Sequence, residues 1–401
     1  MRYSEYKKID EFFHFNEEAI KSHYDIITVL EQGSGRGWLK HPENIREQLL
    51  SIVEKYPSLR EHRVLRFGSR QSMFTPESLV NGMLKKSAKE GCKTFDSWID
   101  KVLNIVSADF SLNCELVGAT QMVRHTLANG VEFCSGAELQ DSPHLRRLVK
   151  ARGAGAFFGQ GPSREGLYFC KLDIKNIEMS TKENRFAFKD QENIIYESIK
   201  SLAIAEKISV SPGSMWLEFV DPDFMMAEAN IFSHQSYETT VGSPFDNRID
   251  ETAFECADKY LRLDEKVKKA LNVPLSRLAM ARRRVSSRDK AVDAAICLES
   301  LFGETGGEIT FKLKMRSALF LGKSLDEKKS ISQKIGNLYS LRSKTVHGSD
   351  DKNDKFWENK SIADDAIDIA TQIIQDIVNE NRLPNKDQLE LSEGIRWQGQ
   401  V

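Results

Sequence analysis

Hydrophobic positions recur with helical spacing over the last third of the chain. From Ile362 to Ile377, for example, apolar residues return every three or four positions, which is the spacing of one buried helix face. No proline occurs between Pro274 and Pro384, so no residue in that interval forces a helix to end. Short connections between such helices are typical of an antiparallel bundle. We expect helices at about residues 251–271, 275–286, 288–302, 308–321, 325–347 and 360–380.

The first 240 residues carry a different pattern. Up to about residue 105 the spacing is still helical. From about residue 108 to 240, short runs of strand-forming residues alternate with Gly, Asn, Asp and Pro, and this mixture predicts an α+β fold. Helices are expected at about 17–31, 43–56, 76–90, 95–106 and 191–205, and strands at about 114–117, 130–134, 166–172 and 214–220.

A linker is predicted where the two patterns meet. The stretch from Thr239 to Asp250 contains Gly242, Pro244 and Asn247, which favour turns and loops. A chain of 401 residues is also too long for one average core. The predicted fold class is therefore an α+β N-terminal region followed by an all-α helical bundle. Its parts are an N-terminal domain over 1–240, a helical domain over 250–383 and a polar tail over 384–401.

The charge balance limits how the chain could contact nucleic acid. It has 40% hydrophobic and 29% charged residues and a formal net charge of -2. This net charge argues against nonspecific binding of nucleic acid by the protein as a whole. Any RNA contact needs a local basic patch. The densest positive cluster is Arg282, Arg283, Arg284 and Arg288. These arginines form either a track for an RNA backbone or a solvated helix end whose charge meets the helix dipole.

Signals for membranes, disulfides and metals do not stand out. No run approaches the roughly 18 apolar residues of a membrane span, and Met1–Lys8 lacks the apolar core of a signal peptide. We expect a cytoplasmic protein without membrane contact. The six cysteines show no C-x-x-C pairing and the eight histidines no H-E-x-x-H spacing. We therefore expect no disulfide framework, no metal and no cofactor.

The strongest chemical signal is a pair, Arg342 and His347, at the end of the predicted helix 325–347. Arg342 continues the apolar stripe of Ile335 and Leu338, so a cation stands where a core residue is expected. Five positions correspond to about 140° of rotation on a helix. His347 can share a side with Arg342 only if the backbone departs from helix near its end, and Gly348 suits such a departure.

Three ordered blocks around this pair resemble the Apea-type branch of the HEPN domains. They are AVDAAICLESLF from Ala291, KLKMRSALFLG from Lys312 and LYSLRSKTVHG from Leu338. The resemblance covers roughly residues 250 to 380 and does not extend to the first 240. Many HEPN domains are metal-independent ribonucleases of bacterial antiphage, abortive-infection or toxin systems. They use an Arg-x(4 to 6)-His motif, which Arg342 and His347 match.

The resemblance implies roles for individual residues. His347 would transfer protons, Arg342 would hold the phosphate, and RNA would be cut by attack of its own 2′-hydroxyl. Glu299 is expected to orient Arg342 as a supporting residue. Ser343 is the second supporting residue; it follows the arginine where many nuclease members have Asn, Asp or His. The active species is expected to be a homodimer through the helical domain, with Tyr339 and Val346 at the edge of the interface.

Other interpretations of the same residues remain open. Arg342 could pair with Glu299, or with another carboxylate, inside the bundle while His347 only caps the helix. The bundle would then be a non-catalytic dimerising module that presents the N-terminal region. In the nuclease interpretation, the N-terminal region would instead sense a trigger, expected to be phage-derived, or restrain the nuclease. A third interpretation, modification by a nucleotidyltransferase of a tyrosine two residues after the histidine, is disfavoured because that residue is Ser349.

Overall fold

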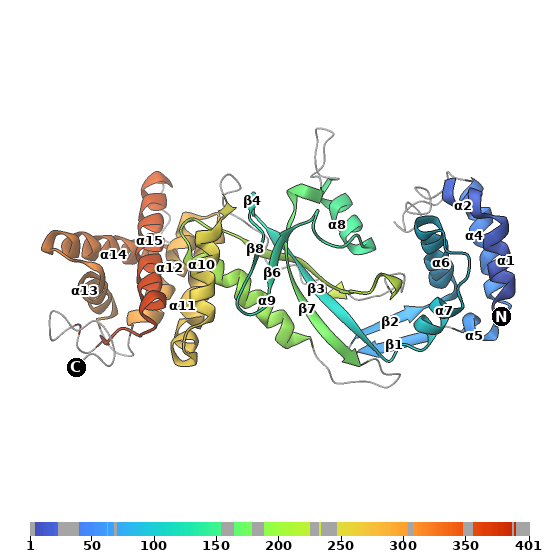
Figure 1. Cartoon of the computed structure of the whole chain (residues 1–401). Helices are drawn as coiled ribbons and strands as arrows, with labels where there is room; N and C mark the ends of the chain where they lie inside the picture. The colour runs from blue at the N-terminus through green and yellow to red at the C-terminus, as the bar shows by residue number, and fades with distance from the viewer. Residues whose placement is uncertain are drawn as a thin grey trace.

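The computed structural model describes residues 5–22, 40–61, 63–67, 70–153, 164–178, 188–224, 232–233, 247–303, 308–347, 356–386 and 389. The molecule is elongated, with the N-terminal helices at one end, a β-sheet in the middle and the C-terminal helices at the other end (Figure 1). The coarse prediction of an N-terminal region with a sheet and a helical C-terminal region is confirmed. In the ranges just given, no helix is long and apolar enough to cross a bilayer.

The central sheet is six-stranded and antiparallel, in the order β5-β6-β7-β3-β8-β9. In the middle of the sheet, Cys114 on β3 lies opposite Cys170 on β7 and Met215 on β8. The four predicted strands fall largely within β3, β6, β7 and β8, but β3 is longer than expected because its polar positions are buried as well. The strands are β5 (His125–Thr126), β6 (Glu132–Ser135), β7 (Tyr168–Glu178), β3 (Ser107–Val117), β8 (Ser211–Phe219) and β9 (Phe232–Ser233).

The two faces of the sheet differ in polarity. Phe110, Leu112 and Cys114 on β3 point into the main apolar core, where α9 (Lys189–Ser201) packs through Ile195 and Ile199. The alternate residues of β3 are polar, and they lie on the opposite face, because successive side chains of a strand alternate. The helix α8 (Pro143–Gly153) packs on that face through a small apolar cluster that includes Leu145, Phe169 and Trp216, and Arg152 adds an ion pair to Glu115.

The N-terminal helices include one that the sequence predicted to the residue. The helix α6 spans Pro76–Glu90, with a capping box from Thr75 to Ser78 at its start and Gly91 in the left-handed conformation (φ +67°) at its end. The hairpin of β1 and β2 was not predicted. The other elements here are α1 (Lys7–Phe15), α2 (Glu17–Ser22), α4 (Lys40–Val53), α5 (Pro57–Arg60), β1 (Arg63–Phe67), β2 (Arg70–Phe74) and α7 (Asp96–Leu103).

Part of one predicted helix and the predicted linker cannot be compared with the structure. The helix expected over 17–31 is described only to Ser22 as α2, and the rest of it lies outside the described residues. Residues 234–246 also lie outside them. After that gap, β10 (Arg248–Ile249) pairs in parallel with β4 (Gln121–Met122), so the chain returns to the sheet region before the helices begin.

The C-terminal region is helical, as predicted, but its first two helices divide elsewhere. The predicted break before Pro274 is wrong, because α11 runs through it and the chain turns at Arg262–Asp264 instead. Proline removes one backbone hydrogen bond, from the carbonyl four residues earlier. That carbonyl belongs to Ala270, an exposed residue, so water can replace the lost partner. The helices are α10 (Glu251–Leu261), α11 (Glu265–Arg283), α12 (Ser287–Phe302), α13 (Ile309–Leu321), α14 (Leu325–Val346) and α15 (Phe356–Glu380).

The two main apolar cores meet at α10. Phe254, near its start, is fully buried in the sheet core, whereas Tyr260, near its end, belongs to the core of the helical bundle. The short helix η2 (Leu202–Ile204) likewise places Ile204 in the bundle core. The sheet region and the bundle are therefore joined by packing as well as by the chain.

Candidate active site

The helix α14 carries both residues of the predicted motif. It begins with a capping box, in which the Ser324 hydroxyl accepts from the Glu327 backbone N–H and the Glu327 carboxylate accepts from the Ser324 backbone N–H. Leu338 and its neighbours on the apolar face are buried. The His347 N–H donates to the Ser343 carbonyl oxygen at 3.0 Å, so regular helical bonding reaches the motif histidine.

Arg342 lies at the edge of the bundle core. Its side chain is 35% exposed, and Nη2 lies 3.3 Å from Oε1 of Glu299. Glu299 comes from the last turn of α12, which packs against α14. This contact was predicted, and both interpretations of Arg342 require it: Glu299 either orients the arginine for catalysis or simply neutralises it.

Tyr339 holds the same carboxylate. Its hydroxyl donates to Oε1 of Glu299 at 2.7 Å, and the guanidinium carbon of Arg342 lies 5.8 Å from the centre of its ring. Burial and the hydrogen bond to Glu299 raise the pKa of Tyr339, so the phenol stays protonated and donates. Tyr339 is only 9% exposed. Its predicted place at the edge of a dimer interface is therefore wrong, because the ring is packed inside its own bundle.

The guanidinium of Arg342 is only partly engaged. Its Nε is covered by protein and has no hydrogen-bond partner among the residues that the structure describes. Leaving such a donor unpaired costs about 1–3 kcal/mol, a cost that a purely structural ion pair does not require. Arginine has five N–H donors in a planar fork, and the exposed part of this fork can take an anion from solution.

His347 is exposed and leaves α14 on another side than Arg342. Because helical hydrogen bonding continues to His347, the two side chains are separated by about 140° around the helix axis. The backbone does not depart from helix before the histidine, and Gly348 lies outside the described residues. Ser343 is exposed and lies four residues before His347, so these two share a side of the helix. One chain alone does not bring Arg342 and His347 onto one face.

The arginine cluster does not form the continuous RNA track that was one of its two interpretations. Arg282 is only 8% exposed. Its Nη1 donates to the carbonyl oxygen of Ala205 at 2.6 Å and its Nη2 to the hydroxyl of Thr371 at 2.8 Å. Burial lowers the pKa of Arg282 to about 10. Arg282 is therefore wrong as an RNA-binding residue, because its charge is enclosed where the sheet region meets α15.

The other arginines of the cluster have separate surroundings. Arg284 donates from Nε to Oδ2 of Asp293 at 3.0 Å, and Asp293 is almost fully buried. Arg277 donates to the other oxygen of the same carboxylate, also at 3.0 Å. Arg283 donates to the hydroxyl of Ser211 at 3.3 Å, and Arg288 is partly exposed near the start of α12. The role of Arg283, Arg284 and Arg288 in RNA binding stays a prediction.

A buried polar network on the sheet escaped the sequence analysis. Glu218 on β8 is 7% exposed and accepts hydrogen bonds from Asn113 and Trp216, at 3.1 and 3.0 Å. Burial raises the pKa of Glu218. On β3, both oxygens of Glu115 accept from Arg152 of α8 at 2.7 Å. The alternation of polar and apolar residues along β3 could have revealed this face. The ion pair from Arg152 to Glu115 adds to the apolar contacts that Leu145 of α8 makes with Phe169 and Trp216 of the sheet.

Neither metal sites nor relatives add to this picture. In the part of the chain that the structure describes, no group of three or more His, Cys, Asp or Glu side chains is placed to hold a metal ion. No protein-family model matches the sequence, and searches of the curated proteins and of the solved structures return no significant match.

Proposed function

We propose that this chain is a metal-independent endoribonuclease whose site is built from Arg342 and His347. The observation that carries the proposal is the position of Arg342: its side chain is 35% exposed at the edge of the bundle, and Nη2 lies 3.3 Å from Glu299. The exposed part of the guanidinium can donate to a phosphate oxygen. His347, exposed at the end of the same helix, supplies a group that can transfer protons near neutral pH.

The reaction follows from what these groups can do. A base removes the proton of a ribose 2′-hydroxyl, the 2′-oxygen attacks the adjacent phosphorus, and the bond from phosphorus to the 5′-oxygen breaks. An acid gives that leaving oxygen a proton. The products are a 2′,3′-cyclic phosphate and a 5′-hydroxyl end. Imidazole can serve as base or acid, and the fork of Arg342 stabilises the negative charge that builds up on the phosphate.

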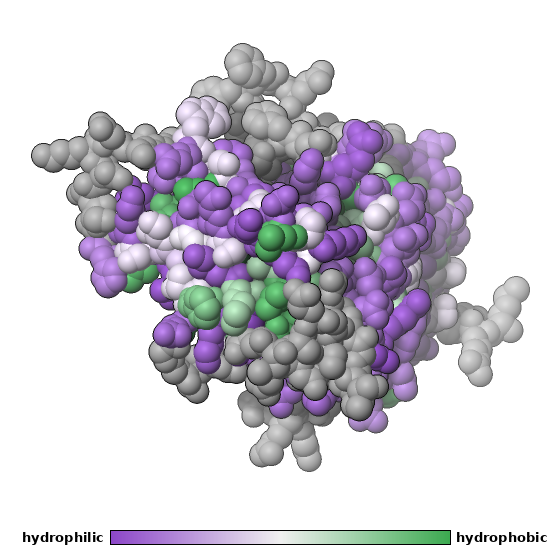
Figure 2. Space-filling view, turned by 90° about the vertical axis from the view of Figure 1, so that its left-hand side faces the viewer, coloured by the Kyte–Doolittle hydropathy of each residue, from purple (hydrophilic) through white to green (hydrophobic). Residues whose placement is uncertain are grey.

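A homodimer would bring an arginine and a histidine together at one site. Because Arg342 and His347 leave α14 on different sides, one copy presents one imidazole and one guanidinium without converging them. A second copy placed across a two-fold axis near the end of α14 brings a further pair to the same place. Val346, which is 60% exposed beside the motif, is the remaining candidate for the interface. The helical end of the molecule shows a few hydrophobic residues among mostly hydrophilic ones (Figure 2).

The biological setting follows from the resemblance of residues 250–380 to Apea-type HEPN domains. We place the protein in the cytoplasm, in an antiphage, abortive-infection or toxin-type system that cuts cellular RNA. The N-terminal region would sense the trigger, of phage origin, or restrain the nuclease. The packing of α10 into both cores supports such coupling, because a change in the sheet region can reach the bundle through one helix.

A second candidate is a non-catalytic dimerising module that presents the N-terminal region. The contacts of Glu299 favour this candidate: its carboxylate forms an ion pair with Arg342 and accepts a hydrogen bond from Tyr339. Pairing of an arginine with a carboxylate is common in proteins without any catalytic role. In this case His347 only ends the helix.

Cleavage of total RNA by the purified full chain, with and without a chelator, separates the two candidates. The nuclease should cut RNA equally well in both conditions and leave cyclic phosphate ends. Cleavage that is lost in chelator and restored by magnesium would indicate a metal-dependent nuclease instead. An inactive but dimeric protein would favour the interaction module. His347→Ala serves as the control for contaminating ribonuclease, since a contaminant would cut RNA in that preparation too.

A further inference from the structure

The side of α14 that carries His347 also carries a row of small residues. Gly336, Ser340, Ser343 and His347 are spaced four, three and four residues apart, so they lie on one side of the helix. Ser340, Ser343 and His347 are exposed. Arg342 lies on another side of α14, toward α12. The surface beside His347 is therefore shallow and accessible from solvent.

The helix α13 borders this side of α14. Residues 322–324 join the two helices, which pack against each other at the end of the molecule away from the sheet (Figure 1). A Cβ atom at Gly336 would lie 3.6 Å from both Cε and Nζ of Lys314, so the ammonium end of Lys314 lies over Gly336. Phe311 comes three residues before Lys314 and lies beside it on α13, and it is 59% exposed. We call Phe311, Lys314, Ser340 and Ser343 the α13–α14 face.

The charged residues of the two helices have one sign. The helix α13 has three basic residues and no acid, and α14 has five basic residues and no acid from Lys328 to its end. Glu308 precedes α13, and Glu327 is used in the capping box of α14. Some of the cations are paired with acids of other helices, as Lys334 is with Asp365 of α15. Because the whole chain has a net charge of only -2, this local excess of positive charge favours a polyanion as the partner of the α13–α14 face.

A second copy of the chain suits the α13–α14 face less well than RNA does. In a two-fold contact the same surface meets itself, so cations would face cations, which is unfavourable. A single strand of RNA brings negative phosphates, and its bases have flat faces that stack on aromatic side chains. Serine hydroxyls donate hydrogen bonds to phosphate oxygens in protein–DNA complexes. The exposed ring, the cation and the two hydroxyls of the face thus match the parts of a nucleotide.

We propose that the α13–α14 face binds a single strand of RNA beside His347, with one base stacked on Phe311 and one phosphate at Lys314. The inference rests on the proposed nuclease for the nature of the strand, and it adds which part of the strand is recognised. His347 comes seven residues after Ser340 on α14, about 10 Å along the helix axis. The stacked base therefore belongs to a nucleotide that flanks the scissile phosphate.

Fluorescence anisotropy of the full chain tests this with a short labelled oligouridine that carries 2′-O-methyl riboses. The probe lacks the 2′-hydroxyl that attacks, so binding is measured without cleavage. A chain that binds the probe as expected but does not cut RNA would refute the proposed nuclease and keep this inference. A chain that cuts RNA but binds the probe without using Phe311 and Lys314 would do the reverse.

Three substitutions of Phe311 test the stacked base. Phe311→Ala should weaken binding at least about fivefold, the lower limit for the loss of one stacked base. Phe311→Leu should weaken it to a similar extent, because leucine is apolar but has no ring, whereas Phe311→Trp should keep the affinity. Phe15→Ala is the control, since Phe15 is 90% exposed at the other end of the molecule. Unchanged affinity in Phe311→Ala, or full affinity in Phe311→Leu, would refute the stacking.

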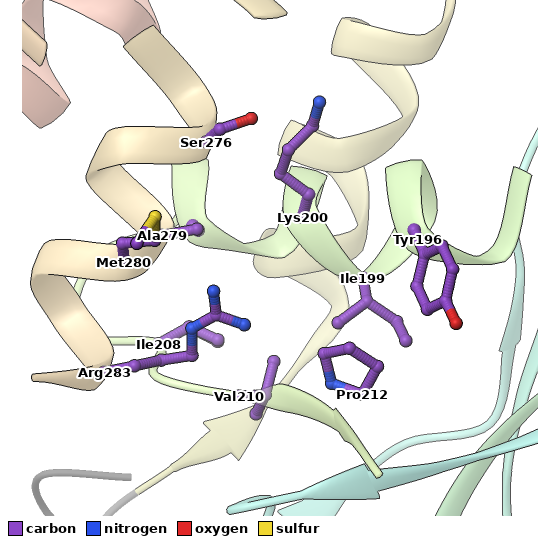
Figure 3. A pocket seen from close by; sticks show the side chains of 11 residues that line it. Tyr196, Ile199, Lys200, Ile208, Val210, Pro212, Ser276, Ala279, Met280 and Arg283 are labelled. Carbon is purple, nitrogen blue, oxygen red and sulfur yellow. The ribbon is translucent and has the colours of Figure 1, made fainter. Parts of the chain in front are cut away.

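The salt dependence of binding identifies the phosphate contact. Each phosphate of a single strand that a protein neutralises contributes about 0.7 to the slope of log affinity against log salt concentration. Lys314→Met should reduce this slope by about 0.7, and Phe311→Ala should leave it unchanged. Lys200→Met is the matched control and should change neither slope nor affinity, because Lys200 borders a cavity between α9 and α11 (Figure 3), remote from α13. An unchanged slope in Lys314→Met would remove Lys314 from the site.

Other partners give different results in the same assay. We expect the strand paired with its complement, and polyglutamate, to bind more weakly than the single strand, because bases in a duplex are stacked on one another and polyglutamate has no bases. Equally tight binding of the duplex would overturn the stacking, and equally tight binding of polyglutamate would assign the α13–α14 face to acidic protein segments. If Phe311→Ala converts a dimer into a monomer in light scattering, the face is an interface between two copies and the proposal is wrong.

Discussion

The Nη2 of Arg342 and the hydroxyl of Tyr339 reach the same oxygen of Glu299, at 3.3 and 2.7 Å. Residues three apart on a helix lie side by side, so one carboxylate can hold both. The arrangement fixes the position of the guanidinium while part of its fork stays exposed. Our first prediction concerns this carboxylate.

Glu299→Gln should lower RNA cleavage by up to about fivefold without abolishing it. The substitution keeps an oxygen for Tyr339 but removes the charge that orients Arg342, and a partly exposed ion pair is worth about 0.2–1 kcal/mol. Single-turnover cleavage rates measure the effect. Tyr339→Phe is the matched comparison: it keeps the charge of Glu299, so it should reduce the free energy of unfolding by about 1 kcal/mol and lower cleavage less than Glu299→Gln does. A complete loss of cleavage in Glu299→Gln would show that Glu299 itself takes part in the chemistry.

Arg342→Ala and His347→Ala should each lower cleavage by at least about a hundredfold. Proton transfer by a positioned side chain contributes about 10²–10⁴-fold, and removing one donor that stabilises transition-state charge costs about 10²–10³-fold. Both side chains are at least partly exposed, so both variants should fold, which circular dichroism and thermal melting can check. Lys344→Ala removes an exposed cation from the same turn and should remain active. Wild-type cleavage by either motif variant would refute the assignment.

Val346→Glu should convert a dimer into a folded monomer and remove cleavage, although Arg342 and His347 are untouched. The new charge would be buried in an apolar interface without a partner. Leu325→Glu is the control, since Leu325 is 66% exposed at the opposite end of α14. Light scattering gives the mass of each variant and the cleavage assay its activity. A monomer that cuts RNA at the wild-type rate would rule out the composite site.

Arg282→Met should destabilise the protein by about 1–3 kcal/mol for each buried oxygen that loses its donor, whereas Arg288→Met should change stability by less than about 0.5 kcal/mol. The first substitution removes buried hydrogen bonds to Ala205 and Thr371 and leaves their oxygens without that donor. The second removes a partly exposed charge. Urea unfolding, followed by tryptophan fluorescence, measures both. Equal stability of the two variants would contradict the structural role of Arg282.

Acid should weaken the fold through His144. Burial lowers the pKa of His144 to about 4, with a further contribution from Arg147, whereas an imidazole in an unfolded chain titrates at about 6.5. The unfolded state therefore binds a proton first as the pH falls. The stability linked to this neutral histidine is fully present above about pH 6.5 and is lost as the pH falls toward about 4. His144→Gln should flatten the pH dependence of the urea midpoint over this window, and an unchanged slope would contradict the prediction.

Some of the structure could be derived from local sequence alone. The helix α6 has its start and end encoded in Thr75, Pro76, Ser78 and Gly91, and the stripe of α15 buries Ala366, Ala370 and Ile373 as the spacing requires. In these cases neighbouring residues in the chain supply the caps and the apolar face. The contact between Arg342 and Glu299 was predicted from the general rule that a charge near a helical core is paired.

Other features depended on residues far apart in the chain. Arg282 looked like a surface cation, yet it is enclosed by Ala205 and Thr371, which are distant in sequence. Pro274 suggested a break in the helix, but the helix continues through it. Proline cannot donate a hydrogen bond to the carbonyl four residues earlier, and that carbonyl belongs to an exposed residue. The β1–β2 hairpin carries arginines among its apolar residues, so its sequence lacks the regular alternation of apolar and polar residues that predicts a strand.

The sequence by itself indicated most helices of the bundle, except for the division between the first two, and it suggested which residues would carry the chemistry of the proposed site, because periodicity, caps and residue type are local properties. Only the tertiary structure decided which charges are enclosed and how the sheet region joins the bundle, and only it placed Tyr339 inside the core and His347 on another side of α14 than Arg342. Burial, and with it the energetic cost of each charge, depends on the packing of segments that are remote along the chain.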